Sequence, residues 1–235
     1  AKVILLIRSD IYAQLPDSNL NKIQRDYGLK IDWYDEACPM SDSPLLELVN
    51  LRARISCGDD VNVVHRWLPY RIYGKNDIEK YLLELTRHRP RDIIQLFNEL
   101  QKRSTGGRLT EQQVLSAEKL YSREYLLHEM RDEVRGLLDD GLDNVAFEIV
   151  FSIRKAEFSL EDAYQAADQF GLSNRQVIQI LRQLFECGMI GMKDVSEAGG
   201  YTTFKYRNPA AVFSTTGMRY IIHRGILKAA NVPSA

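Results

Sequence analysis

Three arginines, Arg87, Arg89 and Arg91, occupy alternate positions around Pro90. Proline is common in the first turn of a helix, because the N–H that it lacks would have no intrahelical partner there. The free backbone amides of that turn attract anions, and arginines beside them add positive charge. Arg89, Pro90 and Arg91 therefore predict a phosphate-binding site. The alternative is a solvated helix start, in which Pro90 only separates two helices.

Arg8 is a second candidate for phosphate binding. It follows an apolar run from Val3 to Ile7 that is typical of a strand covered on both faces in a parallel sheet. Ligands of α/β folds bind at the carboxyl ends of such strands. An arginine placed there can bind a phosphate group bidentately. The alternative is a surface arginine paired with Asp10 or another nearby acid.

Hydrolytic chemistry has little support in the sequence. The four histidines are scattered, and none belongs to an HExxH or nucleophile-elbow pattern. The three cysteines lie far apart without CxxC spacing, which argues against a disulfide framework and a zinc site. The chain also contains no GxxxxGK[ST] phosphate loop. We therefore predict no catalytic residue and no metal ligand, and we expect no nucleotide hydrolysis by this chain alone.

Residues 174–187 are predicted to form a helix that could enter the major groove of DNA. Its apolar positions share one face, and the polar positions on the other face include Asn174, Arg175, Gln179 and Arg182. A hairpin that follows would offer Lys193, Lys205 and Arg207 to phosphates. Residues 140–235, however, carry equal numbers of acidic and basic side chains, whereas DNA-binding domains usually have a basic face. Packing against the rest of the protein or a protein partner is the alternative.

The elements around that helix are predicted from local signals. Capping boxes start helices at Ser159 and Ser173, and an apolar helix precedes them over 145–156. Strands are expected over 189–193 and 201–207, and a closing helix over 220–230. Three helices followed by a hairpin is the order of a winged helix, which is a helix-turn-helix with a β-wing.

The first half of the chain is predicted to be mainly helical. Helices are expected over 21–27, 45–55, 77–86, 90–103 and 110–138, a strand over 2–8 and an extended piece over 31–33. Residues 56–76 are expected to form a loop that Trp67 and Tyr70 fix to the core. Breaks at 105–107 and 139–144 suggest domain boundaries.

The overall composition is ordinary for a globular protein. Of the 235 residues, 45% are hydrophobic and 27% are charged, and the formal net charge is -1. Nothing global in this composition requires a nucleic acid or an anionic membrane as partner. The sequence shows no signal peptide and no apolar run long enough to cross a bilayer. We therefore expect a cytoplasmic location without membrane contact.

Four segments together carry a family resemblance. They are VILLIRSDIYAQLPD, NKIQRDYGLKIDW, YLLELTRHRPRDIIQLFNEL and YIIHRGILKAA. The chain resembles the C-terminal half of bacterial P-loop ATPases of the AAA+/STAND type, and in particular of the FunZ group. The resemblance implies that Arg8 occupies the sensor 1 position and that Arg91, or else Arg89, contacts nucleotide phosphates from a lid. The phosphate-loop half of such ATPases is absent here, so ATP and Mg²⁺ would bind to a longer protein.

The resemblance completes the expected architecture. We expect a mainly α fold with an incomplete P-loop α/β edge over 1–76, a helical lid and connecting helix over 77–138, and a winged-helix domain over 139–235. The functional hypothesis is an ATP-dependent molecular switch that couples nucleotide state to DNA, to a protein partner or to self-association through the ATPase core. The alternative is a winged-helix DNA-binding regulator or a protein-interaction module without nucleotide dependence.

Overall fold

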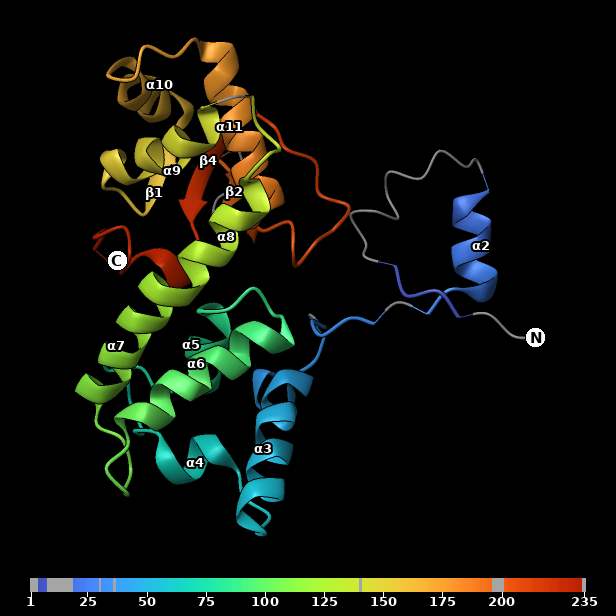
Figure 1. Ribbon diagram of the computed structural model, residues 1–235, viewed down its shortest axis with the longest axis vertical. Helices are drawn as coiled ribbons and strands as arrows, with labels where there is room; N and C mark the ends of the chain where they lie inside the picture. Colours follow the sequence, from blue (N-terminus) through green and yellow to red (C-terminus); the bar gives the residue numbers. More distant parts are fainter. Residues whose placement is uncertain are drawn as a thin grey trace. The chain divides into compact units, whose positions relative to one another are not determined.

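The computed structural model describes residues 4–7, 19–29, 31–35, 37–139, 141–195 and 201–233. Contacts between Cα atoms group the chain into two units, residues 1–32 and 33–235. About half of the chain is helical, and the described residues form one small four-stranded antiparallel sheet, so the fold is mainly α (Figure 1). The domain boundaries expected after residues 76 and 138 stay predictions.

The first unit contains helix α2 (Leu20–Tyr27), which confirms the helix expected over 21–27. The strand expected over 2–8 is wrong for its described part, because residues 4–7 belong to no strand and Ile4, Leu5 and Leu6 are exposed. An isolated strand leaves its backbone groups unpaired, and the described residues of this unit provide no neighbouring strand. The piece expected to be extended over 31–33 belongs to no helix or strand. The predicted P-loop edge is therefore not found. Arg8 lies outside the described residues.

The second unit begins with a set of helices. They are the 3₁₀ turn Met40–Asp42, α3 (Pro44–Cys57), α4 (Val63–Trp67), α5 (Ile78–Glu84) and α6 (Pro90–Arg103). Side-chain oxygens of Ser43, Asn62 and Asp77 accept hydrogen bonds from backbone N–H groups in the first turns of α3, α4 and α5. The helices expected over 45–55, 77–86 and 90–103 are thus confirmed.

The loop expected over 56–76 differs from the prediction in two ways. It contains α4, because the Asn62 side chain accepts a hydrogen bond from His65 N at 3.0 Å and so caps a helical turn. Tyr70 is 75% exposed, so the prediction that it fixes this loop to the core is wrong. Its ring instead lies under the guanidinium of Arg108, 4.1 Å from the ring centre.

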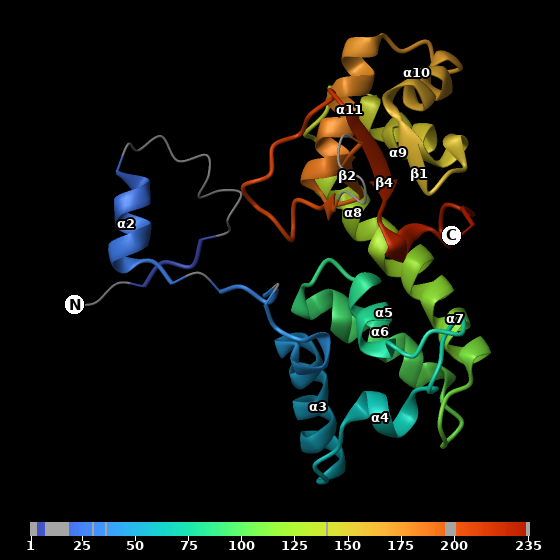
Figure 2. The ribbon, with the colours of Figure 1, turned by 180° about the vertical axis from the view of Figure 1, so that it is seen from behind.

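A long helical segment follows, and the Thr110–Gln113 capping box starts it as predicted. It consists of α7 (Glu111–Leu120), a π-helical stretch (Tyr121–Leu126) and α8 (Leu127–Val134). α6 packs along α7. In both views the α7–α8 segment runs from the α3–α6 group to the C-terminal group of helices (Figures 1 and 2).

The C-terminal part combines three helices with the sheet. The elements are α9 (Leu142–Ile153), β1 (Glu157–Ser159), α10 (Leu160–Asp168), α11 (Asn174–Glu186), β2 (Ile190–Asp194), β3 (Thr202–Thr203) and β4 (Met218–Ile222). The capping boxes at Ser159 and Ser173 are confirmed. The sheet order is β1-β4-β2-β3 with antiparallel pairs, and Met192 of β2 lies opposite both Tyr220 and Thr203.

The closing helix expected over 220–230 is wrong. Residues 218–222 form strand β4, and a 3₁₀ turn (Arg224–Ile226) follows. Pairing with both β1 and β2 satisfies the backbone of β4, and Tyr220 and Ile222 alternate into the core. The returning strand expected over 201–207 is also shorter, because only Thr202 and Thr203 pair with β2. One hydrophobic core extends from α3 to Val232.

Candidate functional site

The predicted phosphate-binding arginines lie in the connection between α5 and α6, residues 86–92, which we call the arginine turn. Arg89 is the N-cap of α6 and Pro90 is its first residue. His88 has a φ of 52°, which is rare for a residue with a side chain and bends the chain sharply before the helix. The side chains on either side of this bend consequently point to different parts of the protein.

Arg87 and Asp92 form a buried ion pair within the turn. Arg87 Nε lies 3.1 Å from Asp92 Oδ2, and the backbone N–H of Arg87 donates to the same oxygen at 3.1 Å. Burial alone would raise the pKa of Asp92, but the charge and hydrogen bonds of Arg87, together with the charge of Arg89, hold it below its ordinary value. Both groups are therefore charged, and each satisfies the other.

Two carboxylates of α8 bind the arginines of this turn. Glu133 Oε1 accepts a hydrogen bond from Arg87 Nη1 at 2.9 Å, and it also accepts one from Arg89 Nη1. One turn earlier, Glu129 pairs with Arg91 at 3.2 Å. The arginine side chains differ in burial, since Arg87 is fully buried whereas Arg89 and Arg91 are 43% and 71% exposed.

The π-helical stretch adds a further contact to the turn. The Tyr125 hydroxyl donates to Asp92 Oδ1 at 2.9 Å, and Arg91 lies over the Tyr125 ring, 5.9 Å from its centre. Tyr121 is fully buried beside Tyr125, and its hydroxyl has no hydrogen-bond partner among the described residues. π-Helical turns inside α-helices occur frequently at functional sites. This one presents Tyr125 to the arginine turn.

His223 of the C-terminal segment contacts the arginine turn. Its Nε2 lies 3.2 Å from the carbonyl oxygen of Thr86, and its Nδ1 accepts a hydrogen bond from Gly225 N at 3.0 Å. Burial, and then the positive charges of Arg87 and Arg207, lower the pKa of His223 to about 3. The imidazole is therefore neutral, and Nε2 is the nitrogen that donates to Thr86.

Aromatic side chains enclose the bend on its other side. The His88 ring makes an edge contact with Tyr34, with ring centres 4.7 Å apart, and stacks on Tyr206 at 5.8 Å. The guanidinium of Arg207 lies between 5.6 and 5.8 Å from the ring centres of Tyr34, Phe204 and Tyr206. The arginine turn thus contacts the start of the second unit, α8 and the C-terminal segment at once.

Comparison with known protein families identifies one part of the chain. Residues 43–128 match the FunZ-associated C-terminal helical domain. The match begins at the N-cap of α3 and ends in the first turn of α8. It therefore contains the whole arginine turn and leaves Glu129, Glu133 and His223 outside. It covers less than half of the chain. No curated protein and no solved structure matches the chain.

Within the segment that matches the FunZ-associated domain, the structure brings Arg89, Pro90 and Arg91 together but pairs both arginines with carboxylates. The sequence analysis assigned no role to the partners Asp92, Glu129 and Glu133. The i, i+4 spacing of Glu129 and Glu133 could have indicated a paired acidic site, because residues with this spacing share one face of a helix. Nucleotide binding by these arginines stays a prediction.

The predicted nucleic-acid-binding residues of α11 differ in their exposure to solvent. Asn174, Arg175 and Arg182 on α11 are exposed, whereas Gln179 is half-buried. Arg175 and Arg182 pair with no carboxylate of the described residues.

The three predicted wing cations all have intramolecular partners. Lys193 lies 3.7 Å from Glu157, and Lys205 lies 3.4 Å from Glu186 and donates to the Ala211 carbonyl at 2.9 Å. Arg207 belongs to the aromatic group described above. A phosphate would have to compete with these partners, so these three cations are less available than the sequence suggested.

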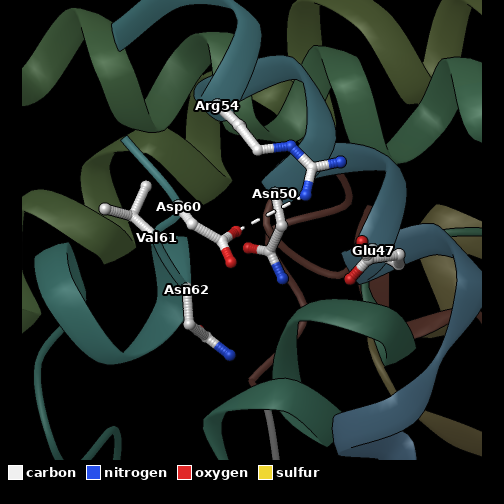
Figure 3. A pocket seen from close by; sticks show the side chains of 6 residues that line it. All are labelled: Glu47, Asn50, Arg54, Asp60, Val61 and Asn62. Carbon is white, nitrogen blue, oxygen red and sulfur yellow. Dashed lines mark ion pairs between the residues drawn. The ribbon is translucent and has the colours of Figure 1, made fainter. Parts of the chain in front are cut away.

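The segment matched by the FunZ-associated domain also contains a shallow polar pocket of about 220 Å³ (Figure 3). Its lining comes from α3 and the loop before α4, namely Glu47, Asn50, Arg54, Asp60, Val61 and Asn62. Arg54 and Asp60 pair across it at 3.6 Å, as the dashed line shows. Asn50 Oδ1 is occupied by a hydrogen bond from Val63 N. The pocket shares no lining residue with the arginine turn.

In the described parts of the chain, none of the helices combines the length and apolar character that a membrane span requires. No group of three or more histidine, cysteine, aspartate or glutamate side chains within the described ranges could hold a metal ion.

Proposed function

We propose that this chain is the C-terminal part of an ATP-dependent molecular switch of the FunZ type. In this proposal the arginine turn contacts the phosphates of Mg²⁺-bound ATP, and the C-terminal part passes the nucleotide state to DNA or to a protein partner. The observation that carries the proposal is the match of residues 43–128 to a FunZ-associated C-terminal helical domain, which encloses two solvent-accessible arginines at the first turn of α6.

The arginines would act by charge and position. Arg91 has the more exposed guanidinium and would make the main phosphate contact, with Arg89 as a second ligand. Pro90 starts α6 and so orients the free amides of its first turn. Arg8, which lies outside the described residues, remains a candidate for the same role. ATP hydrolysis would require a phosphate loop supplied elsewhere in the polypeptide.

Contacts of α8 support a path from this turn to the C-terminal part. Arg131 lies between Glu129 and Glu133 in sequence, and it pairs with Glu148 of α9 at 3.4 Å. Its guanidinium also lies 5.4 Å from the centre of the Phe147 ring. A shift of α8 that follows the arginine turn would therefore change the contacts of α9. Such a shift of packed helices is a common form of conformational switching.

We further propose that residues 139–235 are a winged-helix domain and that the protein acts in the cytoplasm. The element order α9-β1-α10-α11-β2-β3-β4 supports the first part, because α10 and α11 are joined by a short turn and a hairpin follows. The sheet order, with β4 between β1 and β2, brings the last strand back beside the first.

The test is nucleotide binding and hydrolysis by a polypeptide that joins this chain to its phosphate-loop domain. Arg91→Ala should weaken ATP binding or slow turnover about tenfold, because a charge-assisted hydrogen bond to phosphate is lost. Arg52→Ala on α3 is the matched control, since it removes an exposed arginine that pairs with no carboxylate of the described residues. Equal ATP binding and turnover in both variants would refute the role of the arginine turn.

DNA binding independent of nucleotide is the second candidate, and the two exposed arginines of α11 favour it. It predicts retardation of a DNA duplex that weakens steeply with salt, because each neutralised phosphate releases counterions. Arg175→Ala should weaken binding, whereas Lys119→Ala on α7 should not. Absence of retardation at low salt would eliminate this candidate.

A further inference from the structure

We infer that Glu129 and Glu133 of α8 are internal competitors for the phosphate-binding arginines, so that the observed arrangement is a locked state of the turn, in which carboxylates hold both exposed arginines. This inference rests on the proposed function of the arginine turn. Its basis is that each exposed arginine of the turn already binds a carboxylate, Arg89 that of Glu133 and Arg91 that of Glu129. A phosphate ligand must displace these carboxylates.

The two carboxylates are held with different strength. Glu133 also binds the buried Arg87 at 2.9 Å, and breaking that contact would leave a buried charge poorly compensated. Among the described residues, Glu129 pairs only with the exposed Arg91, and exposed pairs contribute little free energy. Glu129 is therefore the exchangeable carboxylate, whereas Glu133 keeps α8 attached to the turn after exchange.

The spacing of the competitors indicates the class of ligand. Residues four apart on a helix carry their side chains on one face, about 5–6 Å apart at Cβ. The arginines thus accept two neighbouring anionic groups. A ligand that replaces them should likewise carry two adjacent anionic groups, as the polyphosphate chain of a nucleotide does, and a single phosphate should compete less well.

The experiment is calorimetric titration of this chain with inorganic triphosphate at low ionic strength. Glu129→Gln should bind triphosphate about two- to fivefold more tightly than the wild-type chain, because Arg91 no longer has a charged internal partner. Glu99→Gln is the control, since it removes the same charge from an exposed pair with Lys102 on α6 and should leave the affinity unchanged. Adding Arg91→Ala to Glu129→Gln should abolish the gain.

The outcomes separate the competition from the proposed function. Equal affinities of Glu129→Gln and Glu99→Gln, together with weaker binding by Arg91→Ala, would overturn the competition and leave phosphate binding by the turn intact. A gain in Glu129→Gln that survives Arg91→Ala would also overturn it, because the gain would then come from net charge alone. No heat of binding in any variant would overturn the competition, because the carboxylates would then have no phosphate ligand to compete with. The proposed function is tested separately, by ATP binding to the polypeptide that includes a phosphate-loop domain.

Discussion

The guanidinium of Arg87 lies 3.1 Å from the carboxylate of Asp92, and neither side chain reaches solvent. Removing one partner of a buried ion pair leaves an uncompensated charge, so Asp92→Asn should lower the free energy of unfolding by about 3–5 kcal/mol. The double variant Arg87→Met/Asp92→Leu should lose less than either single variant. Urea unfolding of the variants measures these differences, and additive losses would contradict a coupled pair.

Acid should weaken the same pair. The pKa of Asp92 is depressed in the folded protein, so the stabilisation is complete above the ordinary aspartate pKa of about 3.9 and is lost as the pH falls below it. The wild-type chain should therefore lose stability below about pH 4 more steeply than Arg87→Met/Asp92→Leu. Urea midpoints measured from pH 5 to pH 3 test this, and parallel curves would argue against it.

The buried His223 makes a separate prediction about pH. Its pKa is about 3 in the folded chain, and an unfolded histidine titrates at about 6.5. The unfolded state therefore binds a proton first, and the wild-type chain should lose up to about 1.4 kcal/mol of stability per pH unit below pH 6.5. His223→Gln lacks this group and should show a smaller slope between pH 6.5 and pH 5. Identical slopes would mean that folding does not lower the pKa of His223.

Gly225 allows the C-terminal segment to approach α5 closely. A Cβ atom at this position would overlap the carbonyl oxygen of Leu85 and the side chain of Leu126. Gly225→Ala should therefore cost about 1–3 kcal/mol of stability. Gly107→Ala is the control, because a Cβ there meets no atom within 4 Å and should change stability by less than about 0.5 kcal/mol. Equal melting temperatures of the two variants would refute the close approach.

Tyr121 and Tyr125 should respond oppositely to the loss of a hydroxyl group. Tyr125→Phe removes a hydrogen bond to the charged Asp92 and should cost about 1.5–3 kcal/mol. Tyr121→Phe removes a buried hydroxyl that has no partner among the described residues, so it should be neutral or stabilising. Chemical denaturation of both variants distinguishes them, and a larger loss for Tyr121→Phe would contradict this arrangement of the π-helical stretch.

Local signals in the sequence predicted many of the helices correctly. Thr110, Ser159 and Ser173 start helices through capping boxes, and Pro90 starts α6, because these signals act within one turn of the chain. Strand β4 was missed because the spacing of its apolar residues also fits a helix. Its pairing with β1 and β2 depends on residues far away in the sequence, which a local pattern does not contain.

The candidate site was predicted only in part for the same reason. The sequence placed Arg89 and Arg91 at a helix start, but it did not distinguish them from Arg87, which is buried. The difference comes from packing around the turn, where Tyr206 stacks on His88 and His223 lies beside Thr86. Glu133, which lies 46 residues further along the chain than Arg87, binds both Arg87 and Arg89 and does not distinguish them. Such partners are brought together only by the tertiary fold.

The most direct test of the account is hydrogen exchange across α8 and α9 with and without inorganic triphosphate. If phosphate at the arginine turn displaces Glu129 and the change reaches the C-terminal part, exchange at the end of α8 and in α9 should change on adding triphosphate. The change should be absent in Arg91→Ala. Unaltered exchange in α8 and α9 at a triphosphate concentration that saturates the wild-type chain would contradict the account.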